Sequence, residues 1–324
     1  MSAGSADARY LITGGGGFIG SSLAEALLAK GERVRVIDDF STGRRSNLQG
    51  LDVELVEGDI CDEATLARAM KGIEVVFHEA ARASVPRSIA QPLAANMVNA
   101  HGTLMVLEAA RAAKVRRVIY AGTSSAYGDT PTLPKREDMK TMPLSPYAVS
   151  KLAGEHYVAV YARLHGLDSL TTRYFNVFGP RQDPNGAYAA VIPRWIASAL
   201  AGEPLQVHGD GSQTRDFSYI DNVVHANILA AQSTRTLGGA VVNVACNDRI
   251  SLLQLAEAIG QEVGRTIQLV HGPARPGDVK DSLADISRAR ELLDYEPVVT
   301  WREGLKRTVA ALRAKVAPNA GTTP

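Results

Sequence analysis

The stretch Tyr10-Leu11-Ile12-Thr13-Gly14-Gly15-Gly16-Gly17-Phe18-Ile19-Gly20 decides the fold. Tyr10-Leu11-Ile12 is short and apolar, and glycines follow it, which predicts a buried strand. The spacing Gly14-x-x-Gly17-x-x-Gly20 meets the demands of a dinucleotide-binding turn: a tight bend, close approach to a pyrophosphate and close packing of helix on strand. From Ile19 on, apolar residues repeat with helical period, and the start of that helix offers N–H groups to phosphate.

A second predicted strand, Arg33 to Ile37, ends in an acidic pair, Asp38-Asp39. Asp38 follows the last glycine at the interval expected for a carboxylate that binds an adenosine ribose. Such a carboxylate accepts the 2′-hydroxyl of NAD and repels the 2′-phosphate of NADP, so the cofactor is predicted to be NAD. Arg44 and Arg45 follow closely and are the one feature that favours NADP. The alternative is a glycine-rich turn beside a solvated acid.

Further predicted strands cover 53–59, 75–78 and 117–121, and a long helical stretch covers 91–113. Alternating strands and helices indicate an α/β fold, a Rossmann-like doubly wound parallel sheet, with ligands beyond the carboxyl ends of its strands. Asp59 ends the third strand, where it either meets an adenine or is a turn residue. The small residue Ala80 follows the fourth strand and lets a cofactor lie close. His78 is assigned no role.

The segment Ser145-Pro146-Tyr147-Ala148-Val149-Ser150-Lys151 predicts a helix start followed by a tyrosine and a lysine on one helix face. An ammonium near a phenol lowers the phenol pKa, so the pair would serve as a general base. Most tyrosine–lysine pairs with this spacing are ordinary neighbours on a helix surface. The interpretation depends on Gly14–Gly20, Asp38, Ala80, Thr123 and Tyr147 all falling at strand ends.

The bulk composition indicates a globular protein of 324 residues, 45% hydrophobic and 21% charged, with a net charge of +1. This charge predicts no nucleic-acid partner. Two cysteines, Cys61 and Cys246, favour a reducing compartment over a disulfide framework. We find neither an apolar run of membrane-spanning length nor a signal pattern, and therefore expect no membrane association and a cytoplasmic location. No metal ligand is assigned.

At Thr123, Tyr147 and Lys151, together with the glycine spacing, the chain resembles the extended short-chain dehydrogenase/reductase family. Its later motifs are similar to those of the nucleotide-sugar 4-epimerases of that family. These motifs are Arg173-Tyr174-Phe175-Asn176-Val177-Phe178-Gly179-Pro180, Gly209-Asp210-Gly211, Arg215-Asp216-Phe217 and Arg275-Pro276-Gly277-Asp278. The likeness runs from about residue 8 to about residue 312.

The resemblance implies a role for each matching position. Tyr147 would be the base, Lys151 would bind the nicotinamide ribose, and Thr123, with Ser124 and Ser125 beside it, would hydrogen-bond the sugar O4. The implied cofactor-binding residues are Gly14, Gly17, Phe18, Ile19, Gly20, Asp38, Asp39, Gly43, Asp59, Ile60, Ala80, Ala81, Asn99, Tyr147, Lys151, Tyr174 and Val177. The implied substrate-binding residues are Asn176, Val191, Gln206, Val207, His208, Arg215, Arg275, Asp278 and Ser282.

The implied reaction is epimerisation at the sugar C4 of a UDP-sugar through transient oxidation to a 4-keto sugar. Relatives that do further chemistry carry acids where this chain has Ser124 and Ser125, so no extra acid or base is expected beside Tyr147. Ser282 occupies the position that faces the sugar C2 in the family, where a large aromatic residue resembles enzymes restricted to UDP-glucose and UDP-galactose. A small residue leaves room for an N-acetyl group, which favours UDP-GlcNAc and UDP-GalNAc. The stretch Asp183 to Tyr188 also resembles the N-acetyl-preferring branch.

The alternatives are a UDP-glucuronate or other UDP-sugar 4-epimerase, a simple NAD-dependent dehydrogenase, and a non-catalytic NAD-binding protein. The last would be expected to lose Tyr147, Lys151 or Thr123, and this chain has all three. We expect an NAD-binding domain over 1–179 plus about 217–249, and a UDP-sugar-binding domain over 180–216 plus 250–313. By analogy with relatives, a homodimer would form through the helix near residue 100 and the Tyr147 helix.

Overall fold

The computed structural model describes residues 8–184, 186, 189–273 and 279–316. Its centre is a seven-stranded sheet in the order β11-β6-β5-β4-β1-β2-β3, and every neighbouring pair is parallel. The order reverses at β1 and β4, as in a doubly wound fold, which confirms the predicted fold class. The strands are β1 (Tyr10–Thr13), β2 (Val34–Asp38), β3 (Glu54–Glu57), β4 (Val75–His78), β5 (Arg117–Thr123), β6 (Asp168–Tyr174) and β11 (Ala240–Val244).

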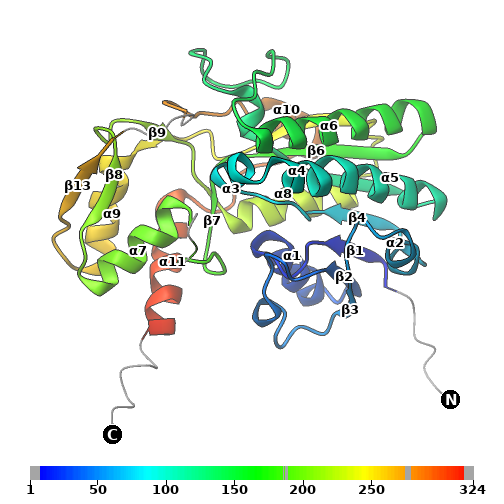
Figure 1. Cartoon of the computed structure of the whole chain (residues 1–324), viewed down its shortest axis with the longest axis horizontal. Coiled ribbons are helices and arrows are strands. Elements are labelled where there is room, and N and C mark those ends of the chain that lie inside the picture. The colour runs from blue at the N-terminus through cyan, green and yellow to red at the C-terminus, as the bar shows by residue number, and fades with distance from the viewer. Residues whose placement is uncertain (1–7, 185, 187–188, 274–278, 317–324) are drawn as a thin grey trace, which may run out of the picture.

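Helices cover both faces of this sheet (Figure 1). On one face α2 (Glu63–Met70), α5 (Thr103–Ala112) and α6 (Pro146–His165) pack side by side, and on the other α1 (Phe18–Ala29) packs on α8 (Ile220–Gln232). Because both faces are covered, the central strands are buried along their whole length. β3 is one of the two edge strands and is mostly exposed, and it is shorter than the predicted segment 53–59.

The long helical stretch is present, but it is not one regular α-helix. α3 (Val85–Ala90) and α4 (Pro92–Asn96) precede a six-residue π-helical segment, Met97–Gly102, that leads into α5. At Gly102 a Cβ atom would lie 2.7 Å from the Ile60 side chain, so the helix here runs close to the loop after β3. Such π segments are rare and often lie near functional sites.

α6 begins where the sequence predicts. The Ser145 side chain accepts a hydrogen bond from the backbone N–H of Ala148, Pro146 occupies the first turn, and Gly166 ends the helix with a positive φ. This start fixes Tyr147 in the first turn of α6, next to the carboxyl end of β5.

The remaining elements form the other end of the molecule, on the left in Figure 1. They are α7 (Val191–Ala201), β8 (Leu205–His208), α9 (Leu252–Val263), β13 (Leu269–Gly272) and α11 (Trp301–Val316). Two short strand pairs lie between the two ends: β7 (Val177–Phe178) with β10 (Ser218–Tyr219), and β9 (Thr214–Arg215) with β12 (Ile250–Ser251). The helix α10 (Ser287–Leu293) packs beside β11. The sequence also predicts a strand over 240–244 and a helix near 252–263, and β11 and α9 have these bounds. The domain boundaries given above stay a prediction.

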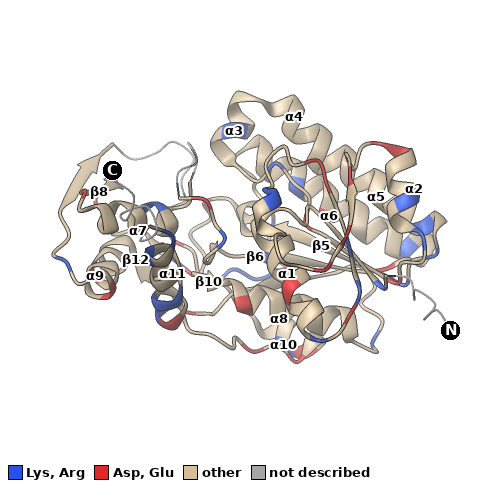
Figure 2. Cartoon of the chain, turned by 90° about the horizontal axis from the view of Figure 1, so that it is seen from below, with Lys and Arg blue, Asp and Glu red and all other residues tan. Residues whose placement is uncertain are grey.

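Figure 2 shows acidic and basic residues mixed at both ends of the molecule, in keeping with the net charge of +1. In the described part of the chain, no helix combines the length and the apolar character that a membrane span requires.

Candidate active site

The glycine turn between β1 and α1 has no room for side chains. Gly14 has a φ of +69°, and a Cβ atom there would lie 2.7 Å from the Ala80 backbone. A Cβ atom on Gly20 would lie 2.4 Å from the Gly14 carbonyl oxygen. Gly17 precedes the twelve-residue helix α1 and provides no side-chain cap, so the first N–H groups of α1 point into the space above the turn. This is the cradle that a pyrophosphate needs.

Asp38, at the end of β2, is buried beside this turn. Its carboxylate accepts hydrogen bonds from the backbone N–H groups of Gly16 (2.8 Å) and Phe40 (2.7 Å). Burial raises the pKa of Asp38, and the two hydrogen bonds oppose that shift. The position of Asp38 agrees with the prediction that its carboxylate binds an adenosine ribose.

The two arginines that favoured NADP are both engaged elsewhere. Arg44 forms an ion pair with Asp183. Arg45 pairs with Glu57, and its guanidinium lies 4.2 Å from the centre of the Phe40 ring. Since neither guanidinium is held beside Asp38 for a 2′-phosphate, the site fits NAD better than NADP.

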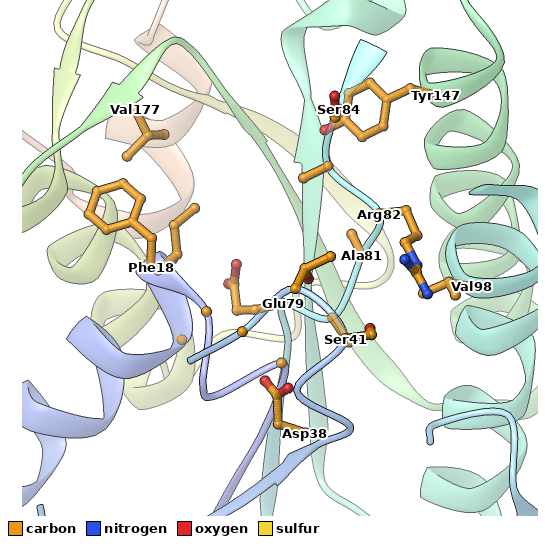
Figure 3. Close-up of a pocket in the computed structure, with 18 of the residues that line it drawn as sticks. Phe18, Asp38, Ser41, Glu79, Ala81, Arg82, Ser84, Val98, Tyr147 and Val177 are labelled. Atoms are coloured by element: carbon orange, nitrogen blue, oxygen red, sulfur yellow. The ribbon is translucent and has the colours of Figure 1, made fainter. Parts of the chain in front are cut away.

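A pocket of about 590 Å³ opens above the carboxyl ends of the central strands (Figure 3). Its volume lies within the ordinary range for ligand sites. The structure brings many of the predicted residues together around it: Gly14, Gly17, Phe18, Ile19, Gly20, Asp38, Asp39, Gly43, Asp59, Ile60, Ala80, Ala81, Thr123, Ser124, Ser125, Tyr147, Tyr174, Asn176 and Val177.

Lys151 lies behind the wall of this pocket rather than in its lining. Its side chain is almost fully buried, and Nζ is 4.2 Å from the centre of the Tyr120 ring. Nζ has no hydrogen-bond partner among the residues that the structure describes. Burial lowers the pKa of Lys151 to about 8, and the carboxylates of Glu79 and Glu155 oppose this shift.

The prediction that Lys151 lowers the pKa of Tyr147 is wrong for this structure. The pKa of Tyr147 is raised, because burial disfavours the phenolate. A hydrogen bond with Thr123 lowers it, whereas the negative charge of Glu79 raises it further. Lys151 faces the Tyr120 ring instead of the Tyr147 hydroxyl.

A smaller hollow of about 140 Å³ adjoins the pocket and shares Ser124, Ser125 and Asn176 with it. Arg215 and Ser282 complete the predicted residues around it. Arg215 Nη1 donates to the carbonyl oxygens of Thr214 (2.8 Å) and Lys280 (3.0 Å), so its side chain is held at the rim. This hollow is the structure's candidate for the sugar end of a substrate.

Several predicted residues do not reach either hollow. The Asn99 side chain is buried between the Arg82 backbone (2.7 Å) and the Ser150 hydroxyl (3.0 Å), so it positions the pocket wall. The β8 strand places Gln206 on an exposed face and Val207 in the core. His208 contacts the Pro273 carbonyl oxygen, and Val191 begins α7. Arg275, Asp278, Asn185, Ala187 and Tyr188 lie outside the described residues.

In the segment that follows β4, the sequence analysis identified Ala80 and Ala81 but missed the polar residues on either side of them. Glu79, Arg82, Ser84 and Arg87 all line the large pocket, and Figure 3 labels the first three of them. Glu79 is a carboxylate of this pocket that the sequence analysis did not consider, and its negative charge adds to the effect of burial in raising the pKa of Tyr147. The signal was available: a carboxylate and two arginines come just after the carboxyl end of a buried strand, where ligands bind in such folds.

The residues present fit a bound dinucleotide. The glycine cradle leaves space that any Cβ atom would fill, the acid at the end of β2 is in place, and a buried ammonium without a partner in the described chain lies behind the pocket. Fold and site together define an NAD-binding enzyme.

Comparisons with known proteins agree with this class. The chain belongs to the NAD dependent epimerase/dehydratase family, whose model matches residues 10–245, and within it to the nucleotide-sugar epimerases of the extended short-chain dehydrogenase/reductases. It is thus an NAD-dependent enzyme of the isomerase class.

Three relatives illustrate the range of this family. The UDP-glucose 4-epimerase of Mycolicibacterium smegmatis is 41% identical over 95% of this chain and 99% of its own. A UDP-N-acetylglucosamine 4-epimerase from Methanobrevibacter ruminantium, solved with UDP-N-acetylmuramic acid, has a TM-score of 0.90 at 38% identity and covers 95% of this chain and 99% of its own. A UDP-glucuronic acid 4-epimerase from Bacillus cereus, solved with UDP-glucuronic acid and NAD, has a TM-score of 0.87 at 33% identity, with 95% and 99% covered.

Proposed function

We propose that this enzyme interconverts UDP-GlcNAc and UDP-GalNAc by inverting the sugar C4, and that it also accepts UDP-glucose and UDP-galactose. The relatives named above are UDP-sugar 4-epimerases that act on different sugars, so the choice among sugars has to come from this chain's own pocket. The proposal of an N-acetylated substrate follows from the size of one side chain.

That side chain is Ser282. It is buried at the smaller hollow, which Ser124 and Ser125 also line, and its hydroxyl accepts a hydrogen bond of 3.4 Å from Asn176 Nδ2. A serine at this position leaves volume that a tyrosine or phenylalanine ring would fill. Since a pocket that is too small rejects a larger substituent, a small residue here supports acceptance of an N-acetyl group.

The chain's own groups can carry out the proton transfer that the reaction needs. The residues that would hold NAD are the glycine cradle, Asp38 and Lys151, and bound NAD supplies the redox chemistry at the sugar C4. Tyr147, with Thr123 beside it, takes the proton of the sugar 4-hydroxyl and returns it when that carbon is reduced again. Arg215 at the rim would bind the diphosphate, so the sugar itself stays free to turn.

The experiment is proton NMR of UDP-GlcNAc and of UDP-glucose incubated with the purified protein at pH 8. We expect the C4 epimer of each, with no net production of NADH. Ser282→Tyr should lose activity on UDP-GlcNAc by tenfold or more while it retains most activity on UDP-glucose. Tyr147→Phe serves as the inactive control that still binds NAD, with a loss of about 10²–10⁴-fold.

A Ser282→Tyr variant with full activity on UDP-GlcNAc would contradict the role of Ser282. A wild-type protein that converts neither sugar would contradict the proposed function itself.

A UDP-uronic acid is the second candidate substrate. Arg82 and Arg87 both line the large pocket, and an arginine pairs well with a carboxylate. UDP-glucuronate therefore belongs in the same NMR panel. Conversion of UDP-glucuronate alone would replace the N-acetylated substrate with the uronate.

We also propose that the protein is a homodimer. Ile89, Leu93 and Met97 on α3, α4 and the π segment are exposed, as are Val149 and Tyr157 on the neighbouring α6. These apolar side chains lie on the two helical stretches that the sequence analysis expects at the dimer interface. The molar mass measured by light scattering tests this proposal: twice the chain mass is expected, and a monomer would contradict it.

A further inference from the structure

Tyr147 is the second residue of α6, so its backbone N–H has no partner within the helix. The Ser145 hydroxyl accepts from the N–H of Ala148 (3.2 Å), and the Ser145 carbonyl oxygen accepts from the N–H of Val149 (3.0 Å). Pro146 has no N–H to donate. In the first turn of α6, the Tyr147 N–H is therefore the donor that needs a partner from outside the helix.

That partner is the hydroxyl of Ser88 on α3, which packs against α6. Ser88 Oγ accepts a hydrogen bond from the Tyr147 N–H (3.0 Å) and donates one to the Val85 carbonyl oxygen of its own helix (2.7 Å). With its proton directed to Val85, the hydroxyl offers a lone pair to Tyr147. Ser88 is only 1% exposed, so bulk water does not compete for this bond.

The backbone of Tyr147 is held on its other side as well. Ser150 Oγ donates to the Tyr147 carbonyl oxygen (2.9 Å) and accepts from Nδ2 of the buried Asn99 (3.0 Å). Asn99 Oδ1 accepts in turn from the N–H of Arg82 (2.7 Å), which fixes Asn99. The N–H and the carbonyl group of Tyr147 are thus both bound by buried serine hydroxyls.

Of these contacts, the one with Ser88 joins Tyr147 to the helix that borders the same pocket. Ser84 caps α3, and both Ser84 and Arg87 line the large pocket with Tyr147. A shift of the first turn of α6 relative to α3 would therefore change where the Tyr147 ring lies in that pocket. A displacement of about 1 Å can cost about 10²-fold in rate, so this contact is important for a proton transfer.

We propose that Ser88 is a positioning residue whose hydroxyl fixes the first turn of α6 by accepting the Tyr147 N–H, and that it thereby sets the place of the Tyr147 phenol in the pocket. Ser88 lines neither hollow, so it acts only through Tyr147 and should affect proton transfer rather than the binding of NAD or sugar. The inference rests on the proposed function in assigning proton transfer to Tyr147.

The test is Ser88→Ala, which removes the acceptor and little else. We expect kcat for the epimerised sugar to fall about tenfold or more, while KM and the affinity for NAD, measured by calorimetry, stay within about twofold of the wild type. Exchange of the Tyr147 amide hydrogen, followed by NMR, should become about tenfold faster, because this N–H loses its acceptor. Ser88→Thr keeps a hydroxyl and should restore kcat and amide protection to within about threefold of the wild type.

Ser169→Ala is the matched control. Ser169 on β6 is also fully buried, and its hydroxyl donates to the Val158 carbonyl oxygen of α6 (3.3 Å). Val158 lies about three helical turns beyond Tyr147, so the loss of this bond should leave both kcat and the exchange of the Tyr147 amide unchanged.

A Ser88→Ala protein that keeps either the kcat or the Tyr147 amide exchange of the wild type would overturn the inference, as would a Ser88→Thr protein as slow as Ser88→Ala. A loss of NAD affinity as large as the loss of kcat would also overturn it, because that result would show a general disturbance of the pocket. The exchange measurement needs no turnover, so it tests the contact even if the wild type epimerises none of the sugars. Failure of the proposed function and failure of this inference are therefore separate outcomes.

Discussion

His78 shows how a single residue in the centre of the sheet is held neutral. It is fully buried, with Nδ1 at 2.7 Å from the Thr13 hydroxyl and Nε2 at 2.9 Å from the Thr103 hydroxyl. Burial, together with the positive charge of Lys151, lowers its pKa to about 3. The sequence analysis assigned His78 no role in chemistry, and this place in the core agrees with that interpretation.

This environment predicts a loss of stability in mild acid. The folded-state pKa of His78 lies below the unfolded value of about 6.5, so the unfolded chain binds more protons and stability falls as pH drops below 6.5. When the pH is lowered from 7.5 to 5.0, the free energy of unfolding of the wild type should fall by about 2 kcal/mol because of His78. Denaturant unfolding at the two pH values measures this loss.

The matched variants are His78→Gln and His156→Gln. His78→Gln should be less stable at pH 7.5 but lose about 2 kcal/mol less on acidification, because glutamine does not titrate. His156 is exposed on α6, and its variant should follow the wild type. An equal loss on acidification in all three proteins would contradict the assignment to His78.

At the scale of elements, the sequence predicts those with strong local signals. Ser145 and Pro146 locate the start of α6, and the glycine pattern locates the turn before α1, because caps and turns depend on a few adjacent residues. The π segment Met97–Gly102 and the end of β5 at Thr123 were not predicted, since both depend on packing with distant segments.

In the candidate site, too, the sequence predicts features that depend on adjacent residues but not contacts between distant segments. Asp38 and the glycines could be located because each has a fixed spacing from the first strand. The buried position of Lys151 against Tyr120, and the contact between Glu79 and Tyr174, join residues from different strands and helices. No local pattern encodes these contacts, so the direction of the Tyr147 pKa shift and the place of Glu79 in the pocket emerged only from the structure.

The packing of α6 on β5 gives an element-scale prediction at Gly154. A Cβ atom there would lie 2.3 Å from the Tyr120 hydroxyl and 3.3 Å from the Asn99 carbonyl oxygen. Gly154→Ala should therefore destabilise the protein by about 1–3 kcal/mol through overpacking, although alanine favours a helix by about 1 kcal/mol over glycine. Thermal unfolding measures this change.

The Tyr120 hydroxyl donates to the Lys151 carbonyl oxygen (2.9 Å), so Gly154→Ala should also weaken NAD binding. His156→Ala, on the exposed side of the same helix, is the control and should change neither property. A Gly154→Ala protein more stable than the wild type would show that helix propensity outweighs the contact.

Over the whole molecule, the segment that leaves β7 is joined to the cofactor half by two ion pairs. Arg181 binds Glu25 of α1 through two hydrogen bonds of 2.8 Å, and Asp183 pairs with Arg44. Gln182 and Asp183 line the large pocket, and so do 41–43. The Arg44–Asp183 pair therefore joins two segments that border the pocket.

Reversing this pair should accelerate the release of NAD. Asp183→Arg places two arginines together, and we expect the NAD dissociation rate to rise about two- to fivefold at low salt, the effect of a partly exposed pair. The double variant Arg44→Asp/Asp183→Arg should recover most of the wild-type rate. Stopped-flow displacement of NAD measures the rates.

The effect should shrink in 0.5 M salt, because salt screens exposed charges. Arg290→Glu reverses one side of a comparable exposed pair with Glu296, away from the pocket, and should leave the rate unchanged. Equal rates for Asp183→Arg and the wild type at low salt would show that the pair does not retain NAD.

Part of the border of the smaller hollow comes from outside the seven-stranded sheet, namely Arg215, Val279, Asp281 and Ser282. The residues of this border can therefore be mutated while the strands that carry the glycine cradle remain intact. A directed-evolution library confined to 279–282 would thus explore new sugar donors for glycan engineering on an unchanged redox scaffold.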